Sequence, residues 1–344
     1  MSEVTTIGLD IAKSVFHAHG ADEHGQTVFS RKIARTKLLG FFAKLPVCLV
    51  ALEACGGAHH WARELMRLGH DVRLIPPAYV KPFVKRQKND AADAEAICEA
   101  ARRPNMRFVA VKSEEQQAAG LAFRTRDLLV RQRTQLANAL RGHLTEFGWV
   151  APRGLAHATK LAALLKEEEM ASSLPTAARK MLRVMIQMLA KLEDRISYLD
   201  REVARRARED EVVRRLMTIP GIGPITATAI VALAPPAETF RKGRDFAAWL
   251  GLTPKQLSSG GKQKLGRISK MGERTIRRLL IIGGSSLVRK ATRHGAPAGS
   301  WLERMLMRKP RMLVSVALAN KTARIAWALM TRQEAYKAPV TATA

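Results

Sequence analysis

Cysteine is scarce in this sequence. The three cysteines, Cys48, Cys55 and Cys98, form neither a CxxC pair nor a Cys/His pattern with metal-ligand spacing. This excludes a disulfide framework and fits a reducing cytoplasm. Long apolar runs are also missing, since none approaches the roughly 20 residues that a membrane-spanning helix needs. An acid, Glu3, lies where a signal peptide would be basic. We therefore expect neither a membrane span nor an export signal.

Aromatic residues and acidic charge are in short supply as well. Aromatics make up 5% of the chain, so base stacking is not expected to dominate any binding of nucleic acid. Residues 1–100 hold 13 basic and 11 acidic side chains, whereas residues 101–344 hold 45 and 19 and carry a net charge of +26. Such a polycation favours nucleic acid as partner, because phosphate binding releases counterions. An anionic membrane surface is the competing partner, but no amphipathic segment has aromatics on its apolar face.

Hydrophobic periodicity predicts an α/β fold for the first hundred residues. Residues 4–34 have the alternation of three short strands, and the continuous apolar run Val47–Leu52 is typical of a strand buried on both faces. A further strand is expected at Asp71–Ile75, before a Pro-Pro pair. Helices are expected at 36–44, 58–68 and 90–102. A meander of strands followed by alternating helix and strand indicates a mixed sheet.

From about residue 114 the pattern changes to long helices, Glu114–Phe147 and about 176–210, with Pro152 and Gly154 between them. The second helix carries an uninterrupted coiled-coil seam whose steps alternate between three and four residues. Two interpretations of the seam stay open, packing against the first helix or a dimerisation arm. The seam residues are Leu182, Met185, Leu189, Leu192, Ile196, Leu199 and Val203.

A third region, expected to be all-α, begins near residue 213. Its segment 216–231 resembles a helix-hairpin-helix motif, in which Gly221 and Gly223 would let backbone N–H groups approach a DNA phosphate. A tight corner between two helices is the alternative. A glycine-rich basic loop at 250–272 then leads into a helix at Glu273–Ile282, and basic amphipathic helices follow at Trp301–Arg332. The predicted divisions are 1–110, 111–212, 213–332 and a disordered tail, 333–344.

Four acids are expected to meet at one edge of the predicted sheet. Asp10 ends the first strand, Glu53 ends the buried strand, and Asp90 and Asp93 open a helix one turn apart. Converging carboxylates repel one another unless divalent cations neutralise them, and Mg²⁺ prefers such oxygen ligands. Two ions could then promote in-line phosphoryl transfer. Taken singly, each acid also has an ordinary explanation; Asp90, for example, could be an N-cap.

The segments around the four acids resemble motifs of two protein families. The segment Gly8–Ser14 resembles the first phosphate loop of actin-like sugar kinases and ATPases, but the second glycine-rich loop of those proteins is absent. Taken together, Gly8-Leu-Asp10-Ile-Ala-Lys13, Glu53-Ala-Cys-Gly-Gly57 and Lys88-Asn-Asp90-Ala-Ala-Asp93 are similar to the DEDD motif of transposases of the insertion sequence 110 family and its 1111 subgroup. The segments Ile219–Pro224 and 250–272 resemble that family's second domain, so the resemblance covers about residues 4–331.

This resemblance implies a RuvC-like, ribonuclease-H fold for the N-terminal domain, and site-specific DNA recombination by multimers. It implies that a structured non-coding RNA, the bridge RNA, pairs with donor and target DNA. It further implies a serine in the C-terminal domain that attaches covalently to DNA and completes the active site formed by the acids. By motif the serine is Ser259, with Ser258 as the neighbouring candidate. The cations expected to hold phosphates, unless they form only a solvated face, are Lys262, Lys264, Arg267, Lys270, Arg274, Arg277 and Arg278.

The sequence as a whole therefore predicts an RNA-guided DNA transposase, cytoplasmic and nucleoid-associated, that acts as a dimer or tetramer with two Mg²⁺ ions. Whether its active site forms within one chain or between two is left open. A metal-only nuclease or Holliday-junction resolvase, with a structural serine, is the first alternative. A non-enzymatic architectural protein that binds nucleic acid is the second.

Overall fold

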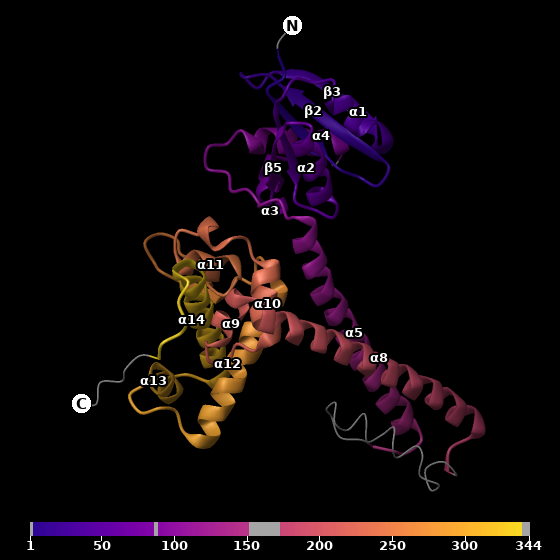
Figure 1. Ribbon diagram of the computed structural model, residues 1–344, viewed down its shortest axis with the longest axis vertical. Helices are drawn as coiled ribbons and strands as arrows, with labels where there is room; N and C mark the ends of the chain where they lie inside the picture. Colours follow the sequence, from indigo (N-terminus) through magenta and orange to yellow (C-terminus); the bar gives the residue numbers. More distant parts are fainter. Residues whose placement is uncertain (1–2, 86–88, 151–172, 339–344) are drawn as a thin grey trace. The chain divides into compact units, whose positions relative to one another are not determined.

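The computed structural model describes residues 3–85, 89–150 and 173–338. The chain divides into two compact units, Met1–Glu115 and Gln116–Ala344 (Figure 1). The predicted boundary near residue 213 stays a prediction. The expected interruption at Pro152 and Gly154, and the end of the predicted tail from residue 339, lie outside the described residues.

The first unit contains the mixed α/β sheet that the sequence predicts. Its strand order is β3-β2-β1-β4-β5. The first three strands form an antiparallel meander, whereas β4 pairs parallel to β1 and β5 pairs parallel to β4. The strands are β1 (Thr6–Asp10), β2 (Val15–Ala21), β3 (Thr27–Ala34), β4 (Leu49–Glu53) and β5 (Asp71–Ile75).

Helices cover both faces of this sheet. Leu9, Leu52 and Phe16 pack on one face against α2, where the ring of Trp61 meets that of Phe16 edge-on at 5.1 Å. On the other face Ala51 and Ile75 pack against α4. The expected helix 36–44 is a 3₁₀ turn followed by a short α-helix. The helical elements are η1 (Arg35–Lys37), α1 (Leu38–Phe42), α2 (Ala58–Arg67), α3 (Pro77–Val80), η2 (Lys81–Phe83) and α4 (Asp90–Ala101).

The helix α4 lies exceptionally close to β1 at Gly8. A Cβ atom on Gly8 would lie 2.1 Å from the carbonyl oxygen of Ala94 and 2.5 Å from the backbone nitrogen of Cys98. Only a residue without a side chain fits there, because real Cβ contacts are never that short. The sequence motif that contains Gly8 therefore has a packing role, which is to let the first turns of α4 lie over the end of β1.

The second unit begins with an antiparallel helical hairpin of α5 (Glu114–Glu146) and α8 (Thr176–Glu209). Along the predicted seam Leu182, Leu189, Ile196 and Val203 are buried. Leu189 packs against Ala137 of α5, so the seam is satisfied within one chain. This matches the first interpretation of the seam. A separate set of α8 side chains stays exposed, namely Met181, Val184, Met188 and Tyr198.

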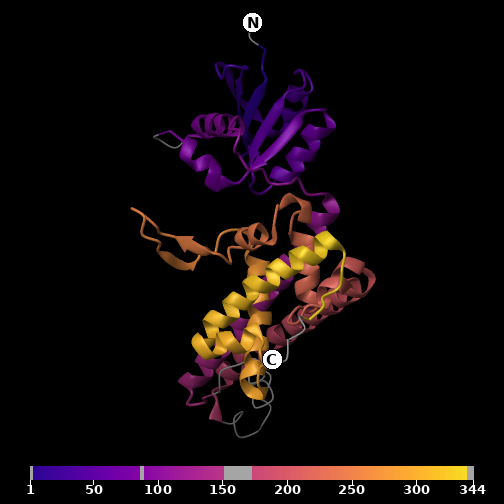
Figure 2. The same cartoon turned by 90° about the vertical axis from the view of Figure 1, so that its left-hand side faces the viewer.

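The rest of the second unit is a helical bundle with one correction to the predicted all-α fold. The expected loop forms a two-stranded antiparallel hairpin, β6 (Pro254–Gln256) and β7 (Leu265–Ile268), which extends as an orange arm from the helices (Figure 2). None of the helices in the described ranges is long and apolar enough to cross a membrane. The helices are α9 (Glu211–Met217), α10 (Pro224–Leu233), η3 (Ala237–Thr239), α11 (Gly243–Trp249), α12 (Arg274–His294), α13 (Trp301–Arg308) and α14 (Arg311–Arg332).

Candidate active site

The four predicted acids lie where two strands end and one helix begins. Asp10 and Glu53 close the neighbouring parallel strands β1 and β4, and both follow a residue that faces α2, so their own side chains face α4. Asp90 and Asp93 lie in the first turn of α4, where the helix dipole favours acids. Asn89 is the N-cap, because its Oδ1 accepts a 2.8 Å hydrogen bond from the backbone N–H of Ala92. The N-cap explanation of Asp90 is therefore wrong.

Electrostatics links the four acids. Burial, followed by the negative charges of Asp93, Asp90 and Glu53, raises the pKa of Asp10 to about 6. Burial and the charge of Asp93 also raise the pKa of Glu53 above its ordinary value. Asp10 and Glu53 are therefore harder to ionise than ordinary carboxyl groups, because burial and the neighbouring negative charges both favour their neutral forms.

The donor set suits Mg²⁺ in its chemistry, but it is not a preassembled metal site. No group of three or more His, Cys, Asp or Glu side chains within residues 3–85, 89–150 and 173–338 is arranged to hold a metal ion. The donors themselves fit, since they are carboxylate oxygens whose mutual repulsion a divalent cation would relieve. An ion shared by three of them would therefore have to draw them closer together.

Sequence reasoning missed a histidine beside these acids. His17 of β2 is the cross-strand partner of Asp10, so the two side chains share the face that α4 covers. Its side chain is 7% exposed, and its Nε2 lies 2.8 Å from the hydroxyl of Ser30. Its Nδ1 is buried and has no partner among the described residues. Burial and the charge of Lys32 lower the His17 pKa, although the charge of Asp90 opposes them. The alternation of Val15–Ala21 could have revealed this histidine.

The predicted serine lies at the tip of the β6–β7 hairpin. Gly260 and Gly261 form a two-residue turn with φ of 55° and 74°, the left-handed pair that a type I′ turn requires. The turn is closed by a 3.0 Å hydrogen bond from the backbone N–H of Lys262 to the carbonyl of Ser259. The hydroxyl of Ser258 accepts a hydrogen bond from the backbone N–H of Lys264, at 3.1 Å. No such bond occupies the Ser259 hydroxyl in the described part of the chain.

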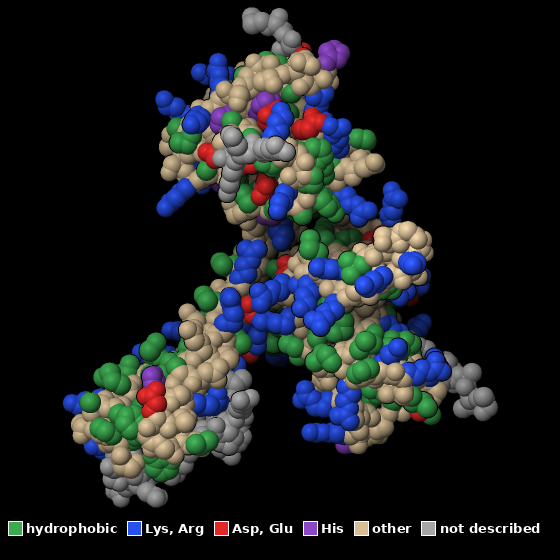
Figure 3. Space-filling view, turned by 180° about the vertical axis from the view of Figure 1, so that it is seen from behind, with side chains coloured by type: hydrophobic (Ala, Val, Ile, Leu, Met, Phe, Trp, Pro, Cys, Tyr) green, Lys and Arg blue, Asp and Glu red, His purple; other side chains and the backbone are tan. Residues whose placement is uncertain are grey.

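Two of the predicted phosphate-binding arginines have other roles. Arg277 is 9% exposed, and its Nη1 donates 2.8 Å hydrogen bonds to the carbonyls of Leu250 and Met271, which flank the hairpin. Its burial corrects the prediction, because a phosphate could not reach it there. Arg278 forms an ion pair with Asp127 of α5. The exposed cations that stay available are Lys262, Lys264, Arg267, Lys270 and Arg274, and Lys and Arg side chains gather over this unit in Figure 3.

The predicted helix-hairpin-helix glycines differ in their surroundings. Gly221 has a φ of 84°, and its carbonyl oxygen lies 2.2 Å from where a Cβ atom on Gly283 of α12 would lie. The corner between α9 and α10 thus packs tightly on α12, which accounts for Gly221 without a phosphate. Gly223 has open space around its Cα. Its contact with phosphate stays a prediction.

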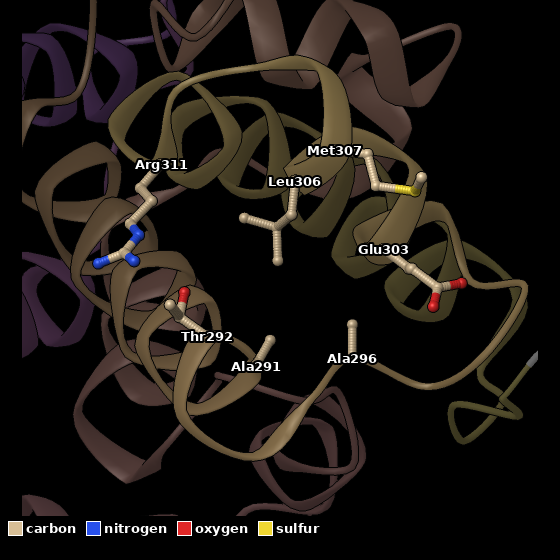
Figure 4. Close-up of a pocket in the computed structure, with 7 residues that line it drawn as sticks. All are labelled: Ala291, Thr292, Ala296, Glu303, Leu306, Met307 and Arg311. Carbon is tan, nitrogen blue, oxygen red and sulfur yellow. The ribbon is translucent and has the colours of Figure 1, made fainter.

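Two cavities in the second unit contain none of the predicted site residues. One, of about 340 Å³, lies between α12, α13 and the start of α14. In Figure 4 Leu306 points into it from one side and Ala291 and Ala296 face it from the other. Ser259 and Asp90 are exposed, whereas Asp10, Glu53 and Asp93 are half-buried.

Segments of both units match known transposase families. A DEDD transposase model matches residues 7–148, and a model for the transposase IS116/IS110/IS902 family matches residues 213–297. The chain is 50% identical to a probable family 20 transposase of Pseudomonas aeruginosa, over 97% of this chain and 99% of that protein. The chain belongs to the IS110 family of transposases. It is therefore an enzyme that breaks and joins DNA strands.

Two further relatives carry the names of their insertion sequences. This transposase is 41% identical to the transposase for insertion sequence element IS1328 of Yersinia enterocolitica, over 96% of this chain and 98% of that protein. It is 39% identical to the transposase for insertion sequence element IS1111A of Coxiella burnetii, over 98% of this chain and 92% of that one. The matched segments of the two family models include all four acids and the serine hairpin.

Proposed function

We propose that this transposase moves a bacterial insertion sequence by combining a Mg²⁺ site at Asp10, Glu53, Asp90 and Asp93 with nucleophilic attack by Ser259, under the guidance of a structured non-coding RNA. The observation that carries the proposal is that the four DEDD acids lie near one another at one edge of one sheet. Asp10 and Glu53 end neighbouring parallel strands, and the charges of Asp93, Asp90 and Glu53 all raise the pKa of Asp10. The rivals, a metal-only nuclease and an architectural protein, assign no covalent role to Ser259.

The acidic half of the proposed site belongs to a RuvC-like domain. Supporting this assignment, the first unit has a five-stranded mixed sheet with helices on both faces, and Asp10 and Glu53 end neighbouring parallel strands. Bound Mg²⁺, two ions in the proposal, would neutralise the scissile phosphate and stabilise the leaving oxygen. The protein's own part is positional: Gly8 lets α4 bring Asp90 and Asp93 over the end of β1.

The serine half of the proposed site is the β6–β7 hairpin. A serine nucleophile must be reachable by a DNA backbone, and Ser259 lies exposed at the tip of a hairpin. Its hydroxyl is also not engaged in the way that the Ser258 hydroxyl is. Ser258 is exposed as well, so the free hydroxyl is the observation that favours Ser259. The acids of the same chain or of a partner chain would complete the site.

Guidance by RNA and assembly into dimers or tetramers complete the proposal. The net charge of +26 on residues 101–344 suits binding to several nucleic-acid backbones at once, donor DNA, target DNA and RNA. Base pairing would read the sequence while the protein reads the backbone. We also propose that the enzyme acts in the cytoplasm, on DNA of the bacterial nucleoid. The apolar side chains of Met181, Val184 and Met188 on α8 are 62%, 49% and 53% exposed, which supports a homo-oligomeric contact there.

Covalent trapping tests the proposal. The full-length protein, the RNA encoded beside its element and a duplex carrying an element end should form a denaturation-resistant protein–DNA adduct with Mg²⁺. Ser259→Ala should abolish the adduct, whereas Ser258→Ala, the matched control, should keep it. Asp10→Ala should abolish strand cutting and leave nucleic-acid binding intact.

Each rival has its own outcome. Mg²⁺-dependent cutting without any adduct would support the metal-only nuclease or resolvase. Binding without cutting in the parent and in Asp10→Ala would support the architectural protein. Omitting the RNA should leave non-specific binding but remove site choice, and site choice that persists without RNA would refute the guided mechanism.

A further inference from the structure

The serine hairpin has two chemically different faces. Ser259 and Lys262 are cross-strand partners at its tip, and Gln256 pairs with Leu265 further down. The backbone N–H of Leu257 donates to the carbonyl of Lys264 at 2.8 Å, which continues the same register. Because side chains alternate along a strand, cross-strand partners share a face.

Counting outward from the tip assigns each residue to a face. Ser259 shares its face with its partner Lys262 and, two residues along each strand, with Leu257 and Lys264. The opposite face holds uncharged residues only at these levels, namely Gln256, Ser258, Gln263 and Leu265. The predicted nucleophile therefore lies on the cationic face, and its neighbour Ser258 lies on the neutral one.

We propose that Lys262 is a catalytic residue of this transposase, whose ammonium group binds the phosphate that Ser259 attacks. This inference rests on the proposed role of Ser259. The turn supports it, because two glycines in the left-handed region fix Ser259 and Lys262 on either side of a two-residue loop. Directly opposed residues have Cβ atoms about 5 Å apart, so both side chains can reach one phosphate.

Charge supports the same assignment. No Asp or Glu occurs between Asp245 and Glu273, so the hairpin itself offers Lys262 no acidic partner. Within the described residues no ion pair involves Lys262, whereas Arg278 is paired with Asp127. Arg277 is committed to the base of the hairpin. Lys264 shares the face but lies two residues further along its strand from the tip.

The chemical step is a transesterification. The Ser259 Oγ forms a bond to phosphorus, and the bond from phosphorus to one deoxyribose oxygen breaks. The serine proton passes to solvent, and the departing oxygen takes up a proton, so atoms and charge balance without a further reactant. Lys262 neither gives nor takes a proton in this step. It stabilises the negative charge that grows on the non-bridging oxygens, as fixed donors do in other transfer reactions.

The test compares four variants of the full-length protein in the adduct assay: Lys262→Ala, Lys262→Arg, Lys264→Ala and Gln263→Ala. Gln263 is the matched control, because it adjoins Lys262 but lies on the neutral face. We expect Lys262→Ala to slow adduct formation by about 100-fold or more. Lys262→Arg should retain most of the rate, because the charge is kept. Lys264→Ala should mainly weaken binding and its salt dependence, and Gln263→Ala should behave as the parent.

A second readout separates catalysis from folding of the turn. A methylphosphonate at the scissile position removes one negative oxygen, so the deficit of Lys262→Ala relative to the parent should shrink at least severalfold on that substrate. An unchanged deficit, or equal rates for Lys262→Ala and Gln263→Ala on normal DNA, would overturn the role of Lys262 alone. An adduct that survives Ser259→Ala, or a parent that forms none, would instead overturn the proposed function.

Discussion

The substitution Gly8→Ala tests how the acidic site is positioned. A methyl group at residue 8 would lie 2.1 Å from the carbonyl oxygen of Ala94, 2.5 Å from the Cys98 nitrogen and 2.8 Å from the Cys98 Cβ. All three belong to α4, and two are backbone atoms that no change of rotamer can move. To restore an ordinary contact, α4 must retreat from β1 by about 1 Å.

The retreat has an energetic and a functional cost. Overpacking of this kind costs about 1–3 kcal/mol, at the upper end here because backbone must move. For a unit of this size that lowers the melting temperature by roughly 10–15 °C. Asp90 and Asp93 lie in the first turn of α4, so they would move away from Asp10 together with the helix. A misplacement of ~1 Å at an active site can slow chemistry by about 100-fold.

Thermal unfolding and Mg²⁺-dependent strand cutting measure the two effects. The matched control is Gly40→Ala, because Gly40 lies in α1 with nothing within 4 Å of its added Cβ. That variant should be neutral or more stable by up to about 1 kcal/mol. If Gly8→Ala melts with the parent and cuts DNA at the parental rate, the close approach of α4 does not position the acids and the reasoning fails.

Three further predictions concern other parts of the molecule. Since the folded state raises the Asp10 pKa from 3.8 to about 6, it binds a proton more tightly than the unfolded state, and its stability falls as pH rises from about 4 to 6. In urea titrations at pH 8 the free energy of unfolding of Asp10→Asn should therefore exceed that of the parent by about 2 kcal/mol. At pH 3 the two proteins should be equally stable, and equal stabilities at pH 8 would contradict the prediction. Arg277→Met leaves the Leu250 and Met271 carbonyls unpaired, which should lower stability by about 3 kcal/mol. Because these carbonyls flank the β6–β7 hairpin, hydrogen exchange of residues 251–270 should become faster. Unaltered exchange would show that Arg277 does not hold the base of the hairpin. Met188→Asp should lower the oligomeric state in sedimentation while keeping the helical signal, and an unshifted profile would exclude the exposed side of α8 as a subunit contact.

Local patterns in the sequence determined much of this protein. We could predict the strands of the first unit, the helices α5 and α8, and the four acids. Alternation, heptad spacing and strand ends are patterns among residues close together in the sequence, so they can be recognised without the fold. The acids could also be brought to one sheet edge, since parallel strands end together. The family resemblance rested on the same ordered motifs.

Only the tertiary structure decided what depends on contacts between distant residues. The glycine-rich segment was expected to be a loop because pairing of Gln256 with Leu265 leaves no periodic trace. Arg277 was counted among phosphate ligands because its burial depends on the Leu250 carbonyl, 27 residues away. The sequence leaves open whether the seam of α8 faces another chain, and in the structure Leu189 packs against Ala137 of α5. His17 lies beside the acids because the register of β1 and β2 pairs it with Asp10. A one-residue shift in that pairing would have turned its side chain to the opposite face of the sheet.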